Sequence, residues 1–506
     1  MKKRILPILL LALLLLSGCG RRSQEIESLA DMKGKALAIG ASDDADTQKF
    51  ILEACPKAEL VSQNDTLLGV RSVADGKIDA YVVGRPYIER AILEGGVKGV
   101  KILEEPLHTY ECGLGLSKTC PIPNYKKSVD ETVERLIADG IIEEMRVRWI
   151  DQEKTEMPEI ELDENPTYTL NAVTFGESKP FSFFFNGELS GFDVELVYRI
   201  CEANHWGLNL TNAQYPAMLM GLGTGKYDML SANLYITAER GENIDFSVPY
   251  KLDEIGVAVR SNSENMVNNG EKKSFLETLE TGLKRTFITE ERWRLIVSGL
   301  IVTVLITLGG FLLANILGAA FCACAMSKGK GLRIFADVYD RIMQGTPMVV
   351  ILMILYYVIF GKSNISGIWV AIIAFGLNSG ASLAQQFCGA ITGVDKGQTE
   401  AALSIGFTKY QTFTGIVFPQ AARAALSGYF STLIALMKGT SIVGYIAVID
   451  LTKSGDLIRS STYDAFFPLL SVALIYFLIS FGLLSLLKYF RKKLEPKRVV
   501  TQEVEK

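Results

Sequence analysis

The hydrophobic residues of this 506-residue chain are concentrated in its C-terminal two-fifths. Four segments there contain no charged residue, and each is at least as long as the roughly 20 residues with which a helix crosses a bilayer. A fifth, weaker segment is interrupted by Lys438. In chain order, the segments are Leu295–Ser327, Ile342–Gly361, Ser363–Val394, Ala424–Val448 and Ala465–Leu487. The pattern predicts five membrane-spanning helices.

Basic residues flank the first and the last of these segments. Lys328, Lys330 and Arg333 follow the first, and a basic run from Lys488 to Arg498 follows the last. Because basic loops stay in the cytoplasm, both places are expected inside the cell. With five crossings, the residues before about 290 then lie outside. The sequence therefore predicts a multi-pass protein of the cell (inner) membrane.

The N-terminus has the layout of a secretory signal. Three basic residues at 2–4 precede an apolar run at 5–16. The tetrapeptide Leu16-Ser17-Gly18-Cys19 resembles a lipobox, which predicts removal of the preceding peptide and lipidation of Cys19. Such diacylation would anchor the chain in membrane lipid. A signal anchor with an incidental cysteine is the alternative.

Cysteine spacing and net charge narrow the chemistry further. Four cysteines are expected in the oxidising exterior, where three full pairings are possible and the sequence does not choose between them. They are Cys55, Cys112, Cys120 and Cys201. Because no Cys-x-x-Cys spacing occurs among them, no metal site is predicted. The net charge of −4, without a basic patch that contains aromatic residues, argues against a nucleic-acid partner.

The N-terminal half alternates strand-like and helix-like patterns in two segments separated by an acidic, proline-containing linker at 151–165. Such alternation predicts two α/β lobes. Strands are expected at 35–40, 78–83, 169–174 and 227–232, and helices at 46–54, 128–150 and 192–204.

Residues 166–262 carry motifs that resemble lobe 1 of the extracellular solute-binding proteins for polar amino acids. These are Lys179-Pro180-Phe181, Gly191-Phe192-Asp193-Val194-Glu195-Leu196 and the stretch from Ile236 to Tyr250. Residues 28–150 resemble lobe 2 at their start, and the family's C-terminal end in Arg148-Trp149-Ile150. The order is inverted, which favours a circular permutation that joins the usual termini through 151–165, because domain termini usually lie close together. A remnant of a lost upstream domain is the alternative.

The resemblance assigns the α-carboxylate of a ligand to Arg240, whose guanidinium offers two parallel donors to a carboxylate. A surface arginine paired with Glu239 or Glu242 is the alternative. Tyr215 matches the aromatic residue that stacks on the ligand, and its neighbours in the cleft supply polar and apolar contacts. The expected substrate-binding residues are Arg240, Tyr215, Asn233, Tyr235, Thr237 and Phe181.

The cleft departs from the family pattern where an amino acid's ammonium group is usually bound. Gly84 stands where lobe 2 normally supplies an aspartate, and Phe175 where lobe 1 has an acidic residue. The loop Ser42–Asp46 brings three carboxylates, a composition that is also typical of a helix start. The sequence therefore predicts a small carboxylate-bearing solute, an amino acid or a relative, without identifying it.

Residues 290–495 resemble the permeases of polar amino-acid ABC importers. The stretch from Glu400 to Gly406, followed after nine residues by Ile416-Val417-Phe418-Pro419, is similar to their EAA loop, a cytoplasmic elbow that docks onto a separate ATPase. Gln344-Gly345-Thr346-Pro347-Met348 matches a second signature, with glutamine in place of arginine. The resemblance implies an ABC ATPase dimer and a second copy of the chain as partners. The expected coupling residues are Glu400, Ala401, Ala402 and Gly406.

The sequence contains no phosphate-binding loop of the type Gly-x-x-x-x-Gly-Lys-Ser/Thr, so ATP hydrolysis is assigned to the partner and no cofactor to this chain. The predicted function is that of an ABC-importer membrane subunit, not an enzyme, that combines a receptor with the pore. A ligand sensor and an amino-acid-gated channel with the same clamshell are the alternatives. The expected domains are a signal peptide (1–22), lobe 2 (23–150), a linker (151–165), lobe 1 (166–262), a linker with the first membrane-proximal helix (263–294), an all-α permease domain (295–490) and a cytoplasmic tail (491–506).

Overall fold

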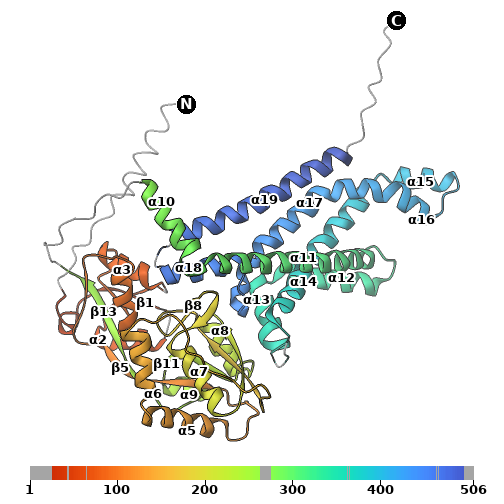
Figure 1. Cartoon of the computed structure of the whole chain (residues 1–506). Coiled ribbons are helices and arrows are strands. Elements are labelled where there is room, and N and C mark those ends of the chain that lie inside the picture. Colours follow the sequence, from red (N-terminus) through yellow and green to blue (C-terminus); the bar gives the residue numbers. More distant parts are fainter. Residues whose placement is uncertain are drawn as a thin grey trace, which may run out of the picture.

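The computed structural model describes residues 26–42, 45–63, 65–261, 275–361, 363, 365–462, 464 and 466–494. A two-lobed α/β domain leads into a bundle of long helices, and the α/β domain lies against one end of that bundle (Figure 1). This architecture agrees with the fold class expected from the sequence. The signal and the lipidation site predicted at Cys19 lie outside the described residues.

The α/β domain is built on one ten-stranded sheet to which both sequence segments contribute. Its main path runs β10-β6-β11-β5-β13-β3-β1-β2, with β12 beside β5 and β4 beside β13. The strands are β1 (Ala38–Ala41), β2 (Glu59–Ser62), β3 (Ala80–Gly84), β4 (Val100–Ile102), β5 (His108–Leu116), β6 (Thr169–Thr174), β10 (Gly207–Asn212), β11 (Met229–Tyr235), β12 (Asp245–Phe246) and β13 (Lys251–Arg260).

Two long antiparallel strands in the middle of this sheet connect the lobes. β5 pairs with β11 at one end and with β13 at the other, and β13 continues onto β3. Parallel β6, β10 and β11 form the sheet of lobe 1, and parallel β1, β2 and β3 form that of lobe 2. The chain thus enters lobe 1 at β5, within the range expected for lobe 2, and returns at β13, within the range expected for lobe 1. β5 and β13, here called the hinge strands, are therefore the two segments by which the chain passes between the lobes. The linker at 151–165 does not connect them.

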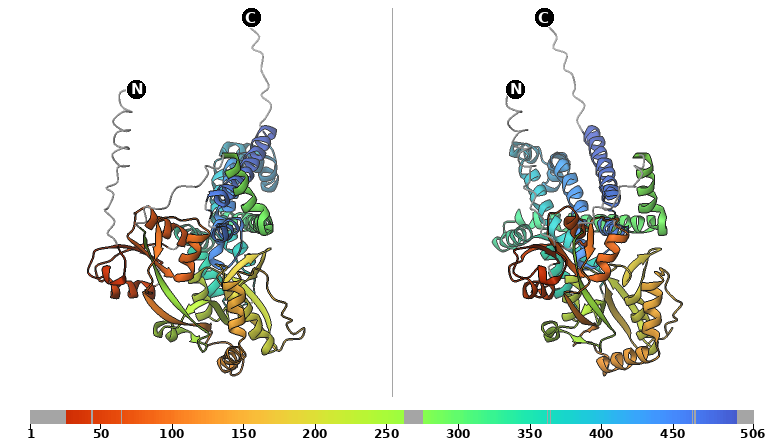
Figure 2. Two further views of the ribbon diagram at one scale, coloured as in Figure 1. Left: turned by 60° about the vertical axis from the view of Figure 1, so that its left-hand side comes forward. Right: turned by 90° about the vertical axis from the view of Figure 1, so that its left-hand side faces the viewer.

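Helices pack around both halves of the sheet (Figure 2). Those that follow lobe 2 strands are α2 (Ala45–Ala54), α3 (Thr66–Ala74) and α4 (Arg85–Leu93), after the short η1 (Leu29–Asp31). Those of lobe 1 are α5 (Tyr125–Ala138), α6 (Ile141–Arg146), η2 (Val147–Asp151), α7 (Phe192–Ala203), α8 (Tyr215–Gly223) and α9 (Ala238–Asn243). The helix expected over 128–150 is divided because Gly140 adopts a positive φ of 75° between α5 and α6.

Residues before and after the linker share one hydrophobic core in lobe 1. Trp149 of η2 is fully buried and meets the ring of Phe183 edge-on, with 6.1 Å between ring centroids. Met157 and Leu162 of the linker pack against the same core. A small three-stranded sheet lies nearby and consists of β7 (Glu177–Ser178), β8 (Ser182–Phe185) and β9 (Glu188–Ser190). The four cysteines considered for disulfides are all free thiols in this structure.

The helical domain begins with α10 and continues to the end of α19. Among the described residues, three helices are long and apolar enough to cross a membrane, and two bent pairs raise the number to as many as five. The elements are α10 (Phe275–Leu283), η3 (Lys284–Ile288), η4 (Thr289–Glu291), α11 (Trp293–Ala325), α12 (Lys330–Gly345), α13 (Met348–Met353), η5 (Ile354–Ile359), α14 (Gly367–Thr392), α15 (Lys396–Ser404), α16 (Lys409–Thr412), η6 (Phe413–Val417), α17 (Phe418–Gly439), η7 (Thr440–Ile446), α18 (Leu451–Thr462) and α19 (Phe466–Leu494).

The sharpest bend in this domain follows a proline. α12 and the helix that starts at Met348 meet at 105°, with Thr346 and Pro347 between them. Proline lacks the amide that would continue the helical ladder, so a helix ends there readily. Lys438, which interrupts the weakest hydrophobic segment, is exposed in the last turn of α17.

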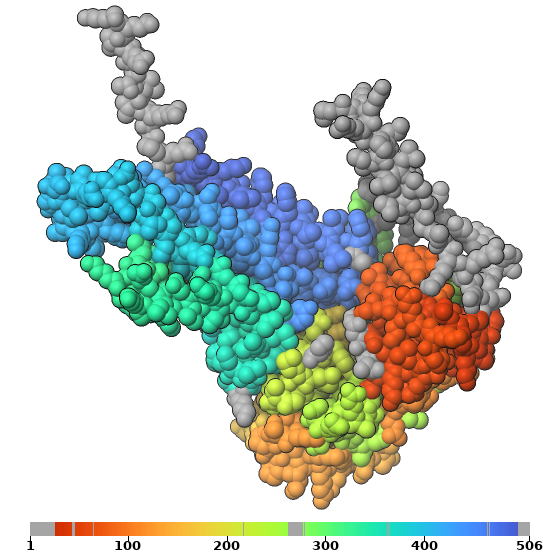
Figure 3. Space-filling view, turned by 180° about the vertical axis from the view of Figure 1, so that it is seen from behind, coloured from red at the N-terminus to blue at the C-terminus, as the bar shows by residue number. Residues whose placement is uncertain are grey.

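The two ends of the bundle are occupied by different parts of the chain. The α/β domain touches the end that carries α13 and α18, whereas α15 and α16 project from the opposite end (Figure 1). The space-filling view from behind shows the same separation along the length of the molecule (Figure 3). The helices between the two ends therefore connect them directly.

Candidate functional site

Arg240 faces the opposite lobe across the interlobe cleft. It lies in α9 of lobe 1, where the hydroxyl of Thr237 caps the helix by accepting a hydrogen bond from the Arg240 amide at 3.3 Å. Its Nη2 is 3.4 Å from Oδ2 of Asp46, a residue in the first turn of α2 in lobe 2. The side chains are only 11% and 15% exposed. A carboxylate of the protein therefore sits at the guanidinium that the sequence analysis assigned to a ligand.

Two tyrosines support the guanidinium from lobe 1. The Cζ atom of Arg240 lies 6.0 Å from the ring centroid of Tyr215 and 5.8 Å from that of Tyr235, which is within cation–π range. Nη1 of Arg240 also donates to the backbone carbonyl of Tyr235 at 3.1 Å. The structure thus brings Arg240, Tyr215, Tyr235 and Thr237 together in one cluster.

The other two predicted site residues lie nearer the hinge. Asn233 is buried, adopts a positive φ of 50° at an irregularity of β11, and donates from Nδ2 to Oδ2 of Asp253 at 2.6 Å. Phe181 is also buried, and Nζ of Lys251 lies 3.6 Å above its ring. Both residues therefore contact the start of hinge strand β13 and not the Arg240 cluster.

Tyr87 takes up the space next to Gly84, where lobe 2 would carry the ammonium-binding aspartate. A Cβ atom at Gly84 would lie 2.9 Å from Cδ2 of Tyr87 and 3.8 Å from the Tyr235 hydroxyl. The Tyr87 hydroxyl reaches lobe 1, where it is 2.7 Å from Oγ of Ser178. Tyr87 thus fills the space that Gly84 leaves open and bridges the lobes. The two lobes are in contact at two places, Tyr87 with Ser178 and Asp46 with Arg240.

The expected coupling loop forms an exposed elbow at the far end of the bundle. α15 begins with Asp395 as its cap and ends just before Gly406, whose φ of +94° turns the chain toward α16. Glu400, Ala401 and Gly406 are exposed, whereas Ala402 is buried within the elbow. Apolar side chains also face outward there, among them Leu403, Ile405, Phe407 and Tyr410.

Comparison with known proteins identifies both halves of this arrangement. Residues 170–297 match the bacterial extracellular solute-binding proteins, family 3. Residues 310–496 match the binding-protein-dependent transport system inner membrane component family. The putative glutamine transport system permease protein GlnP of Rickettsia conorii is 31% identical over 210 residues, which are 40% of this chain and 93% of that protein. The chain belongs to the binding-protein-dependent transport system inner membrane components.

Two proteins of Bacillus subtilis are similar to this chain to a comparable degree. The probable amino-acid ABC transporter permease protein YckA is 35% identical over 198 residues, covering 38% of this chain and 86% of that protein. The L-cystine transport system permease protein TcyB is 32% identical over 215 residues, covering 42% and 91%. The helical domain is therefore a permease domain, and the α/β domain before it contains a solute-binding unit.

Lobe 1 of the solute-binding domain contacts the permease domain directly. Nζ of Lys226 donates to the carbonyl of Ser363 at 3.0 Å and lies 4.6 Å above the ring of Tyr356. Tyr227 and Tyr356 place their hydroxyls 3.4 Å apart. Beside these contacts is a cavity of about 1200 Å³ lined by lobe 1, the linker and the adjoining loops of the permease domain, including Asn171, Asp228, Pro158, Ile365 and Val448.

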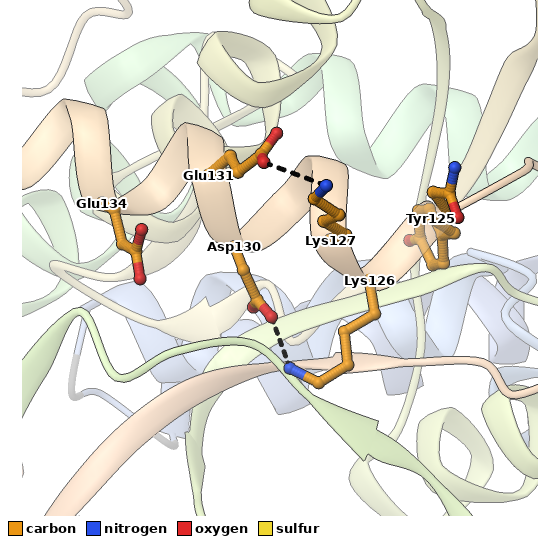
Figure 4. A pocket seen from close by; sticks show the side chains of 7 residues that line it. Tyr125, Lys126, Lys127, Asp130, Glu131 and Glu134 are labelled. Atoms are coloured by element: carbon orange, nitrogen blue, oxygen red, sulfur yellow. Dashed lines mark hydrogen bonds and ion pairs between the residues drawn. The ribbon is translucent and has the colours of Figure 1, made fainter.

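A hollow of about 610 Å³ along α5 is a poorer candidate for binding. Its charged side chains are already paired with one another, Lys126 with Asp130 at 2.5 Å and Lys127 with Glu131 at 3.7 Å (Figure 4). The second oxygen of Asp130 accepts from the Val248 amide at 2.8 Å. These groups therefore stabilise the surface of α5 and its contact with the segment between β12 and β13.

Sequence reasoning missed two residues of the cleft and left a third undecided. The three carboxylates of residues 42–46 fit both the cleft and a helix start in the sequence, and the structure pairs Asp46 with Arg240. Tyr87 lies in α4, three residues after Gly84. The absence of a side chain at Gly84 was the signal that a larger neighbour fills this space. Lys251 opens β13 and lies 3.5 Å from Asp253, a pairing that only the hinge geometry reveals.

Proposed function

We propose that this chain is the receptor and pore subunit of an ABC importer for a small carboxylate-bearing solute, an amino acid or a relative. The clamshell closes on the solute outside the cell by a hinge motion of β5 and β13. Two copies of the permease domain form the pore, and a separate cytoplasmic ATPase dimer drives the cycle through the elbow at Glu400 to Gly406. Neither a metal nor a cofactor takes part in this scheme within the chain itself.

The Arg240–Asp46 pair is the observation that carries the proposal for the solute. A guanidinium that is 11% exposed and flanked by two tyrosines already holds a carboxylate from the opposite lobe. A solute carboxylate brings the same chemistry and displaces Asp46. Because charge-assisted hydrogen bonds are stronger than neutral ones, a carboxylate is favoured here over an amide or an alcohol.

The arrangement of the whole molecule supports the direction of transport. The solute-binding domain and the elbow lie at opposite ends of the permease helices (Figure 3). The basic residues after the first and last membrane segments favour a cytoplasmic elbow. The solute-binding domain then faces the exterior, where it meets the solute before the pore does.

The experiment uses the full chain purified in detergent and a panel of amino acids, dicarboxylates and small peptides, each with a matched analogue that lacks the carboxylate. A ligand that binds the folded state raises the melting temperature by mass action. We expect carboxylate-bearing compounds to raise it and their analogues not to. Arg240→Ala should abolish the rise, whereas Arg146→Ala, at a half-buried arginine of α6 that pairs with Glu143 and Asp151, should preserve it.

Asp46→Asn provides the reciprocal test, because it removes the competing carboxylate and leaves the guanidinium in place. We expect it to tighten solute binding by about three- to tenfold, the range of a partly exposed ion pair worth up to about 1.4 kcal/mol. Unaltered affinity in Arg240→Ala by calorimetry would remove Arg240 from the site. Co-purification of an ATPase subunit separates an importer from a channel, and solute-stimulated ATP hydrolysis in that complex argues against a pure sensor.

A further inference from the structure

Helix α18 of the permease domain contacts both lobes of the solute-binding domain. Its Lys453 hydrogen-bonds Oε1 of Glu177 in lobe 1, and its Ser460 donates to Oε2 of the same carboxylate at 3.2 Å. Its Arg459 forms an ion pair with Asp65 in lobe 2. Helix α18, which follows α17 and precedes α19 in the chain, is therefore in contact with both lobes at once (Figure 1).

Each carboxylate is fixed within its own lobe. Asp65 is the cap of α3 and accepts a hydrogen bond from the Leu68 amide at 2.9 Å. Glu177 belongs to β7, next to Ser178, which contacts Tyr87 across the cleft. Because both carboxylates are held by secondary structure, a movement of either lobe moves its carboxylate relative to α18.

The helix itself is fixed to the transmembrane helices. The Leu451 amide donates to Oγ1 of Thr303 in α11 at 3.1 Å, and the Thr452 and Tyr476 hydroxyls are 3.1 Å apart, which ties α18 to α19. A Cβ atom at Gly299 of α11 would lie only 2.2 Å from Oγ of Ser454, so the two helices approach closely there. A force on α18 is therefore transmitted to both of its neighbours.

The two lobe contacts differ in burial and hence in strength. Lys453 and Glu177 are 4% and 13% exposed, and removal of one partner from such a buried pair costs about 3–5 kcal/mol. Arg459 and Asp65 are both 22% exposed, and a pair with that access to water contributes about 1 kcal/mol or less. Lobe 1 is thus held firmly, with further support from Lys226, while lobe 2 is held by a contact that can break and re-form.

We propose that Arg459 detects closure of the cleft: it pairs with Asp65 only when lobe 2 has swung onto lobe 1, and α18 passes this state to the permease helices. The inference rests on the proposed function in one respect, since it takes the hinge motion of the clamshell as given. It does not depend on which solute binds. Lobe 1 acts as the fixed base and lobe 2 as the moving arm.

The test is a charge-swap cycle in the full chain in lipid nanodiscs, without added solute. Spin labels on unnatural amino acids at Lys77 of lobe 2 and Ile288 of the permease domain, which are 70% exposed in side chain and 66% exposed, report the distance between them. Asp65→Arg and Arg459→Asp should each lower the ratio of closed to open molecules by up to about fivefold. The double variant should restore the wild-type distribution. The swap Lys127→Glu with Glu131→Lys on α5 is the matched control and should change nothing.

Unchanged distances in both single variants would overturn the proposal, and so would a double variant that stays as open as the singles. Rescue by the double variant also excludes misfolding as the cause of opening. If no member of the solute panel binds but the charge swap still rescues closure, the proposed solute receptor fails and the closure contact stands. If solute binds and the swap has no effect, the reverse holds.

Discussion

Trp149→Ala tests whether the two sequence segments form one domain. Trp149 comes from the segment before the linker, yet its main partners come from the segment after it. Its ring is 0% exposed and meets Phe183 edge-on, and its Nε1 donates to Oε2 of Glu195 at 2.6 Å. The same carboxylate, itself fully buried, accepts from Arg148 and Arg199.

The magnitude follows from these contacts. Truncation of a fully buried tryptophan costs about 3–5 kcal/mol through lost transfer energy and the cavity left behind. The lost hydrogen bond to a charged group is worth about 1.5–3 kcal/mol, and because it shares a site with the cavity, the two effects do not simply add. We expect a total near 4–6 kcal/mol, a large share of the roughly 5–15 kcal/mol that holds a domain together. Trp149→Phe keeps the packing and should lose about 1–3 kcal/mol.

The assay is urea unfolding of residues 26–261, followed by far-ultraviolet circular dichroism so that the substituted tryptophan is not the probe. A single transition that shifts as a whole to lower urea is expected. Leu93→Ala, at a leucine that is 77% exposed, should stay within about 0.5 kcal/mol of the parent. A Trp149→Ala fragment with an unchanged midpoint, or one whose two halves melt separately, would refute the single permuted domain.

Three further outcomes can be measured. Burial raises the pKa of Asp193 to about 6, and its Oδ2 has no hydrogen-bond partner. Between about pH 4 and 6 the folded domain then binds more protons than the unfolded chain, so stability falls as pH rises. Asp193→Asn should remove that slope and raise stability at pH 7 by up to ~3 kcal/mol in the same urea assay. Gly406→Val should weaken co-purification of the ATPase at least several-fold, because a branched side chain disfavours a φ of +94°, while Gly415→Ala in a helix should not; equal yields for both would contradict the role of the turn. Glu400→Arg should abolish coupled uptake yet leave solute affinity unchanged, and full uptake would remove this exposed residue from the docking surface.

Local patterns predicted much of the fold. The strand expected at 169–174 is β6 with the same limits, and the helix expected at 192–204 differs from α7 by one residue. Their limits followed from the local pattern, but their burial did not: α7 buries Asp193 and Glu195 beside its apolar residues, and β6 buries Ala172, Val173 and Thr174 in a row. Helix ends were less accurate where a single backbone conformation decides them, as at Gly140, which divides a continuous amphipathic pattern into α5 and α6.

Contacts between distant segments could not be predicted in this way. Asp46 and Arg240 belong to different lobes, and Lys453 and Glu177 are 276 residues apart in the chain. No periodicity records such a partner, because each side chain satisfies its local pattern equally well when exposed. The motifs located Arg240 and its aromatic neighbours, whereas the carboxylate opposite it required the closed arrangement of the lobes.

The covalent connection between the solute-binding domain and the permease domain lowers the affinity that the contact between them requires. A receptor that diffuses freely must meet its transporter from dilute solution, so its docking depends on the amount of receptor present. Here the tether holds the two surfaces at an effective concentration in the millimolar range, as for modules joined by a short linker. An ion pair as modest as Arg459 with Asp65 can then contribute to this contact without a high affinity of its own. The rate of docking becomes a property of each molecule, independent of how many copies the cell makes.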